Sequence, residues 1–218
     1  MSMMCAILAV SAPQLAALRA RPELASDLAE ISAFDVPQKK LEARLRQAPP
    51  EVRAQFEAAR RAMMADNPVL REEHARLEAA RPVLDRLGPF EEVLDLDKSW
   101  NILHYLFTGH SDAASAPGDA LLSGEPIGRD LGYGPLRAHD VAETRAFRDF
   151  LEPLTTERLV GRMDFKQMAS LRVYPIDAVP YPANAQAWRT DIARAFQQLR
   201  AYVQGAADKG EGLLIWLS

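Results

Sequence analysis

Residues 3–10 read MMCAILAV, a continuous apolar run with the length of a β-strand. An apolar run this short, without polar alternation, is typical of a strand buried on both faces. A second such run, LLIWL at residues 213–217, ends the chain after the turn-forming segment DKGEG at residues 208–212. We therefore expect both ends of the chain to supply adjacent strands of one small mixed sheet.

Helix signals follow the first strand directly. Ser11 and Gln14 have the spacing of a capping box, and Pro22 suits the first turn of a second helix. Residues 38–87 are rich in Ala, Arg, Glu and Leu, and their prolines suit the first turns of helices or the breaks between them. This composition predicts three helices, at about 38–47, 51–65 and 68–80.

Further helix starts occur in the second half of the chain. Asp140, Thr155 and Asp164 each precede a helical pattern as candidate N-caps. A long helix is predicted from about residue 184, and residues 171–174 form a short strand candidate. Helices therefore supply most of the bulk around a small sheet, and the predicted fold class is α+β.

Composition limits the range of functions. The 218 residues are 48% hydrophobic and 26% charged, with a net charge of −4, so no basic field favours nucleic-acid binding. The single cysteine, Cys5, excludes an internal disulfide and a multi-cysteine zinc site. A membrane span needs about 20 consecutive apolar residues, and no segment approaches that length. We expect a cytoplasmic protein that binds neither nucleic acid nor membrane.

Candidate site residues concentrate in one block, which reads DLDKSWNILHYLFTG at residues 95–109 and LLSGEPIGRDLGYGPLR at residues 121–137. Asp97 is a predicted N-cap for a helix that runs to Phe107 and stops at Gly109. On that helix Asp97 and His104 share one stripe, which Trp100 flanks.

Two interpretations of His104 remain open. In the first, His104 is a general acid or base that Asp97 orients, because imidazole titrates near neutral pH. In the second, Asp97 is only the cap, and His104 is a partly buried residue whose ring bonds to Thr108 or to a loop carbonyl.

The glycine-rich segment at residues 124–135 also has two interpretations. It could bring backbone amides to an anion, with Arg129 or Arg137 supplying positive charge and with Asp130 and Tyr133 among the contacts. It lacks the phosphate-loop ending and the dinucleotide spacing. It could instead be an irregular segment covering the sheet, with Arg129 and Asp130 in an ion pair.

No recognised metal or nucleophile pattern accompanies this block. The four histidines have no zinc-ligand spacing, and no Gly-x-Ser-x-Gly elbow occurs. We expect no metal site and no cofactor.

The same block resembles the core motif of the YfbM-like family of bacterial proteins of unknown function. The resembling residues are DLDKSW at 95–100, His104 and LFTG at 106–109, followed by LLSG at 121–124 and GYGP at 132–135. The resemblance implies a single small α+β domain over residues 1–218, with a helical elaboration at about 38–87, and it implies no catalytic residues. Asn101 departs from the histidine expected in many relatives, so a paired-histidine metal site would be incomplete here.

Two hypotheses of function follow. One is a non-catalytic binding or interaction module that uses the helix at residues 97–108 and the loop at residues 124–137, with a small molecule, a protein or a second copy of the chain as partner. The other is an enzyme acting on an anionic or phosphorylated substrate, with His104 as acid or base. The enzyme hypothesis requires His104 and Arg129 or Arg137 to line one solvent-reached pocket.

Overall fold

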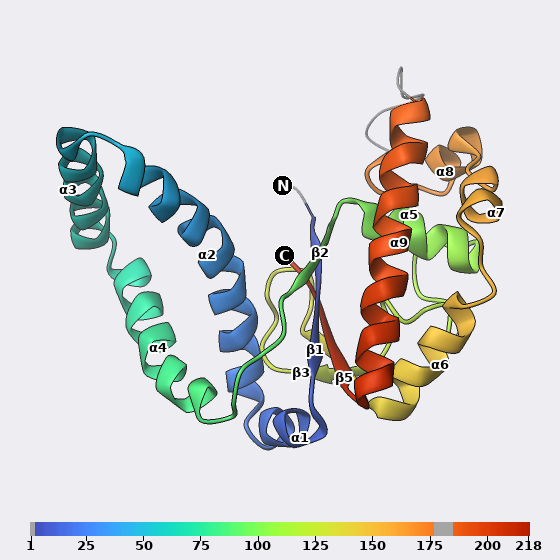
Figure 1. Ribbon diagram of the computed structural model, residues 1–218, viewed down its shortest axis with the longest axis horizontal. Coiled ribbons are helices and arrows are strands. Elements are labelled where there is room, and N and C mark those ends of the chain that lie inside the picture. The colour runs from blue at the N-terminus through green and yellow to red at the C-terminus, as the bar shows by residue number, and fades with distance from the viewer. Residues whose placement is uncertain (1–2, 177–184) are drawn as a thin grey trace.

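The computed structural model describes residues 3–176 and 185–218, with the backbone alone at residues 34–44, 60–61 and 64. Its five strands are β1 (Cys5–Val10), β2 (Leu94–Asp97), β3 (Glu125–Ile127), β4 (Leu136–His139) and β5 (Gly212–Leu217). They form one sheet in the order β2-β1-β5-β4-β3 (Figure 1). The two terminal strands are neighbours, as predicted, and the α+β class is confirmed. Every pairing in the described sheet is antiparallel, where the sequence analysis expected a mixed sheet.

The sheet has a separate apolar core on each face. Ile7 lies opposite Ile215 in the β1–β5 register, and both side chains enter the core beneath α5 (Ser99–Thr108), α6 (Val141–Leu151) and α9 (Ala185–Lys209). Leu8 and Leu214 alternate to the other face and enter the core that includes residues of α1, α2 and α4. Both strands are therefore buried on two sides, which explains their unbroken apolar character.

Prolines open the helices of the first half of the chain. These helices are α1 (Ala12–Ala20), α2 (Pro22–Gln47), α3 (Pro50–Asp66) and α4 (Pro68–Asp85). The Ser11–Gln14 capping box is present at the start of α1. In Figure 1, α2, α3 and α4 extend away from the sheet as an arm, with α3 at its far end.

One predicted helix boundary in this arm is wrong. The sequence analysis separated a helix beginning at Pro22 from another at about 38–47, whereas α2 is continuous through Pro37. An interior proline removes one helical hydrogen bond and costs about 3 kcal/mol. Good helix formers follow Pro37 at residues 38–45 and favour continuation of the helix despite this cost.

Helix caps organise the second half of the chain. Asp140 and Glu143 form a capping box at the start of α6, Thr155 caps α7 (Thr156–Gly161) and Asp164 caps α8 (Phe165–Ser170). The predicted strand at residues 171–174 is wrong, because the chain turns there and Arg172 has a φ of +56°. No helix in the described residues is long and apolar enough to cross a membrane.

Candidate functional site

Helix α5 is an interior element rather than a binding surface. All of its residues from Trp100 to Phe107 are buried. Gly109 ends the helix in the left-handed conformation, as predicted. Asp97 is not its N-cap: it is the last residue of β2, with a φ of +45°, and the N-cap position belongs to Lys98 without a side-chain hydrogen bond. The backbone N–H of Asp97 donates to the Asp95 side chain, which accounts for this turn.

His104 is completely buried and is held by the loop that follows α5. Its Nε2 lies 2.7 Å from the carbonyl oxygen of Asp112, and its Nδ1 lies 3.6 Å from Oδ1 of Asp119. Burial lowers the pKa of His104 below its ordinary value, although the Asp112 carbonyl and Asp119 oppose this effect. The loop carbonyl expected by the structural interpretation is therefore present, whereas Asp97 is not recorded as a partner of the ring.

Asn101 and Trp100 also anchor distant segments. The Asn101 amide donates to the carbonyl of Ser111 at 2.8 Å and accepts the N–H of Tyr174 at 2.8 Å. Trp100 Nε1 donates to the carbonyl of Met3 at 3.4 Å, and the ring is buried in the core. Through these hydrogen bonds, α5 fixes the positions of three segments that are packed around it.

Arg129 joins the glycine-rich segment to the helical arm. Its guanidinium donates to Asp27 at 3.0 Å and to Glu30 at 2.7 Å, both on α2. Arg76 of α4 pairs with the same two carboxylates. The predicted partner, Asp130, is not involved. The charge of Arg129 is therefore already compensated within the protein.

Asp130 shapes the loop itself. Its Oδ1 accepts the N–H groups of Gly132 and Gly134 at 2.7 and 2.9 Å, and these bonds hold the pKa of Asp130 below its ordinary value. Both glycines have positive φ, at +105° and +99°. The turn carries the next residues, Tyr133 and Pro135, to the edge of a groove.

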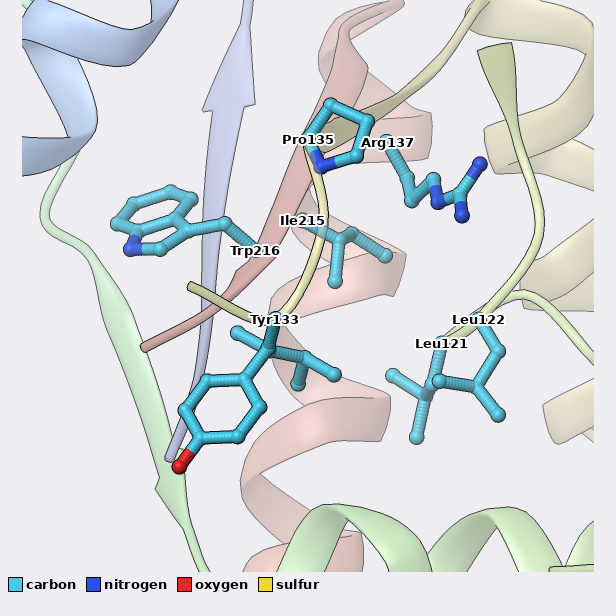
Figure 2. Close-up of a pocket in the computed structure, with 8 residues that line it drawn as sticks. Leu121, Leu122, Tyr133, Pro135, Arg137, Ile215 and Trp216 are labelled. Carbon is cyan, nitrogen blue, oxygen red and sulfur yellow. The ribbon is translucent and has the colours of Figure 1, made fainter. Parts of the chain in front are cut away.

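This groove encloses about 320 Å³, part of it open to solvent, where the glycine-rich loop meets β4 and β5. Arg137 and Tyr133 both border it (Figure 2). The other lining residues are apolar: Leu121, Leu122, Pro135, Ile215, Trp216 and Leu217. Arg137 is half-buried, and no hydrogen bond or ion pair joins its guanidinium to any residue that the structure describes.

The β5 edge also presents backbone to the groove. Met4 and Ser218 form two backbone hydrogen bonds with each other, so they are a hydrogen-bonded pair at the end of the β1–β5 ladder. The next pair, Cys5 and Leu217, is therefore a non-hydrogen-bonded pair, and the N–H and C=O groups of these two residues point away from each other. The β4–β5 ladder stops at the pair Arg137–Ile215, two residues short of Leu217. Continuing the register places Pro135 opposite Leu217, and proline has no N–H to donate. The N–H and C=O of Leu217 thus point toward the β4 side beyond the end of the ladder, and the C=O has no N–H at Pro135 to accept.

The structure separates the predicted site residues into different places. His104 and Trp100 lie in the core, Asp97 ends an edge strand, Arg129 and Asp130 stabilise the loop, and only Tyr133 and Arg137 share a groove. The sequence analysis missed Asp119, whose carboxylate faces His104, and missed the apolar lining residues Leu121, Leu122 and Leu217. Of these residues, only Leu217 had a signal in the sequence, because the apolar run at residues 213–217 placed it at the end of a predicted strand.

Among residues 3–176 and 185–218, no group of three or more His, Cys, Asp or Glu side chains is arranged to hold a metal ion. The groove offers one guanidinium, one phenol and backbone groups. A guanidinium is a group that can pair with an anion, and most of the other lining side chains are apolar.

These features define an α+β protein in which an antiparallel sheet lies between two helical layers and a glycine-rich loop borders a small groove. The chain belongs to the family described as Domain of unknown function (DUF1877), whose model matches residues 1–216. The fold is similar to the crystal structure of YfbM from Escherichia coli, a protein of unknown function, with a TM-score of 0.56, 16% identity and coverage of 99% of each chain. At this identity the similarity establishes the fold alone. A comparison with curated proteins gives no match.

Proposed function

We propose that this protein is a non-catalytic binding module for a small anionic molecule, which binds in the groove between the glycine-rich loop, β4 and β5. The observation that carries this proposal is Arg137, a half-buried residue that lines the groove and whose guanidinium has no carboxylate partner among the described residues. Removing a charge from water without a partner is costly. An anion in the groove would compensate that cost through charge-assisted hydrogen bonds.

Helix α5 contributes to this site indirectly. His104 bonds to the carbonyl of Asp112 and Asn101 bonds to that of Ser111, so α5 holds the start of the segment that leads to Leu121 and Leu122. At the other end of that segment, His139 Nε2 lies 2.9 Å from the carbonyl of Ala120. The wall of the groove is thus fixed by buried side chains, which favours a preformed binding site.

The catalytic alternative receives less support. It requires His104 to share a solvent-reached pocket with Arg129 or Arg137, yet His104 is fully buried and does not line the groove. Asp97, its predicted orienting residue, lies at the end of β2. No lining residue of the groove is a carboxylate or histidine that would act as a general base.

A thermal-shift screen tests the proposed function. Purified protein is heated with a panel of carboxylates, phosphorylated metabolites and sulfate at fixed ionic strength. A ligand at 100 times its dissociation constant adds about 2.7 kcal/mol, which raises Tm by roughly 5–10 °C for a chain of this length. The shift should disappear in Arg137→Gln.

Arg145→Gln is the matched control. Arg145 is exposed on α6, beyond the other end of β4, and its replacement removes the same charge. A ligand shift that both variants abolish would indicate a nonspecific charge effect. A shift that Arg137→Gln leaves intact would place the ligand elsewhere and refute the proposed site.

The remaining expectations about partners, cellular location and domain organisation stay predictions. They are a protein partner or homodimer, no nucleic-acid binding, a cytoplasmic location, and the treatment of residues 38–87 as an elaboration of a single domain. Light scattering over a range of protein concentrations tests the homodimer, and expression of residues 1–218 with a shortened α2–α4 arm tests the elaboration.

A further inference from the structure

We infer that the ligand of the groove is a monocarboxylate whose single charge is carried on a short apolar chain or ring. This inference rests on the proposed function and narrows it to one chemical class. It follows from the number of charges in the groove, the nature of its lining and its size.

The charge of the groove matches one carboxylate. Arg137 is the single ionisable cation among the lining residues, and none of them is acidic. A guanidinium presents two parallel N–H groups to the two oxygens of a carboxylate. Polyphosphates carry several charges that usually engage a cluster of cations or a metal ion, and the groove supplies neither.

The lining beside Arg137 matches an apolar body. Leu122, Pro135 and Leu217 are half-buried, so their side chains still have surface to cover. Leu121 and Ile215 are almost fully buried beneath them. Figure 2 shows Arg137 and Tyr133 on opposite sides of Ile215, with Leu121 and Leu122 forming another side of the groove. A ligand with its carboxylate at Arg137 would lay its apolar part across Ile215.

Tyr133 and Leu217 provide the remaining polar groups. Tyr133 is 37% exposed, and no hydrogen bond joins its hydroxyl to a residue that the structure describes. The N–H of Leu217, which points toward the β4 side beyond the end of the ladder, is a second donor beside the groove. These donors suit a neutral polar substituent, but they add no further charge.

Size restricts the ligand further. The 320 Å³ of the groove includes space that is open to solvent, so the part enclosed by protein is smaller than the sites of about 300 to 1,000 Å³ that enclose drug-sized ligands. A nucleotide or dinucleotide would extend well outside it. A short fatty acid or an arylalkanoic acid would lie along the row of apolar side chains with part of its chain open to solvent.

Titration calorimetry with butyrate, hexanoate and octanoate, and with phenylpropionate, tests this class. Burying one methylene group strengthens binding about fourfold, so each two-carbon extension should lower Kd by roughly an order of magnitude until the groove is full. Hexanamide, which has the same chain without the charge, should bind at least tenfold more weakly than hexanoate. Glucose 6-phosphate and inorganic phosphate should not compete.

Three variants separate the contributions. Arg137→Gln should weaken hexanoate binding at least tenfold and make hexanoate and hexanamide equivalent, while Arg145→Gln should change neither. Leu122→Asn, at a half-buried position that lines the groove, should reduce the gain per methylene. Amide NMR spectra should show the Leu217 N–H signal shifting on addition of hexanoate and remaining still in Arg137→Gln.

The outcomes distinguish this inference from the broader proposal. Arg137-dependent binding of phosphorylated compounds without any chain-length effect would overturn the monocarboxylate class and leave anion binding in place. If the Kd of the carboxylates still falls with chain length in Arg137→Gln, the binding would be nonspecific apolar contact, and this result would overturn the inference. Failure of every anion to bind at 10 mM, on the order of the weakest affinity worth considering, would overturn both proposals.

Discussion

Nδ1 of His104 lies 3.6 Å from Oδ1 of Asp119, and neither buried atom has a hydrogen-bond partner among the residues that the structure describes. The carbonyl of Asp112 can only accept, so the contact at Nε2 places the ring proton of neutral His104 there. Nδ1 then presents a lone pair to a carboxylate. Two buried acceptors face each other, and only an added proton on the ring or the carboxylate would join them.

Asp119→Asn should therefore stabilise the protein at pH 8. The Asn amide can donate to Nδ1 where the carboxylate cannot, and satisfying a buried group is worth about 1–3 kcal/mol. Urea unfolding of the two proteins at constant pH measures the difference. The segment around Asp119 also leads to Leu121 and Leu122 of the groove, so ligand binding should be retained in the variant.

Destabilisation by Asp119→Asn would have a specific meaning. It would show that His104 is protonated in the folded state and forms a buried ion pair with Asp119. Asp119→Ala is the companion variant, since it leaves Nδ1 unpaired in either case and should be less stable than Asp119→Asn.

Acid sensitivity follows from two buried histidines. Burial lowers the pKa of both His104 and His139 below their ordinary value near 6.5. Between the folded-state pKa and 6.5 the unfolded chain binds more protons than the native one, so stability is lost as the pH falls through this window and is fully present above it. The free energy of unfolding should decrease from pH 7.5 to pH 5, before most carboxylates titrate.

Unfolding curves at half-unit pH steps measure this loss directly. His139→Gln should remove part of the slope between pH 6.5 and 5, because its side chain does not titrate. A histidine NMR signal assigned to His104 that titrates above pH 6.5 would contradict the prediction and would favour the ion pair with Asp119.

Much of the fold was predictable because it depends on local patterns. The terminal strands are unbroken apolar runs, and the caps at Ser11, Asp140 and Thr155 have the spacing that satisfies free amides at a helix start. The start of α5 was mispredicted because Asp97 has the residue type of a cap while its backbone is set by pairing with Cys5. Tertiary pairing there overrides the local signal.

The site was less predictable because its partners are distant in sequence. Nothing around Arg129 indicates Asp27 and Glu30, which are about 100 positions earlier on α2. The same holds for Arg137, whose groove depends on where β4 stops pairing with β5. The glycine-rich segment could be identified as a loop, but which of its two arginines was already paired required the packed structure.

Replacing Trp100 by alanine should be strongly destabilising. The ring is 4% exposed in the core, and its indole N–H donates to the carbonyl of Met3. Truncation of a buried Trp costs about 3–5 kcal/mol. Guanidinium unfolding measures the loss, with Trp188→Ala as control, because Trp188 on α9 is only partly buried. Equal losses in the two variants would refute the assignment of Trp100 as a principal core residue.

The glycine-rich loop allows a steric effect to be separated from a backbone effect. Gly128 and Gly132 both have positive φ, at +82° and +105°, so an alanine is strained at either position. A Cβ at Gly128 would clash with Ser26 Oγ and would lie 3.0 Å from the carbonyl of Pro22, whereas a Cβ at Gly132 meets nothing within 4 Å. Ser26 Oγ also accepts the N–H of Arg129, so it cannot move without breaking that bond.

Gly132→Ala should accordingly lose only the conformational cost, about 1–3 kcal/mol. Gly128→Ala should lose more, since it also displaces Ser26 and weakens the contact between Arg129 and α2. Urea unfolding measures both variants, and the difference between them isolates the close approach of loop and helix. Measured against Ser26→Ala alone, which already lacks the bond to Arg129, Gly128→Ala should cost less than it does in the unmodified protein, because the hydroxyl that the new methyl group would strike is absent. Equal stabilities of the two single variants would show that loop and helix are not packed as tightly as these distances indicate.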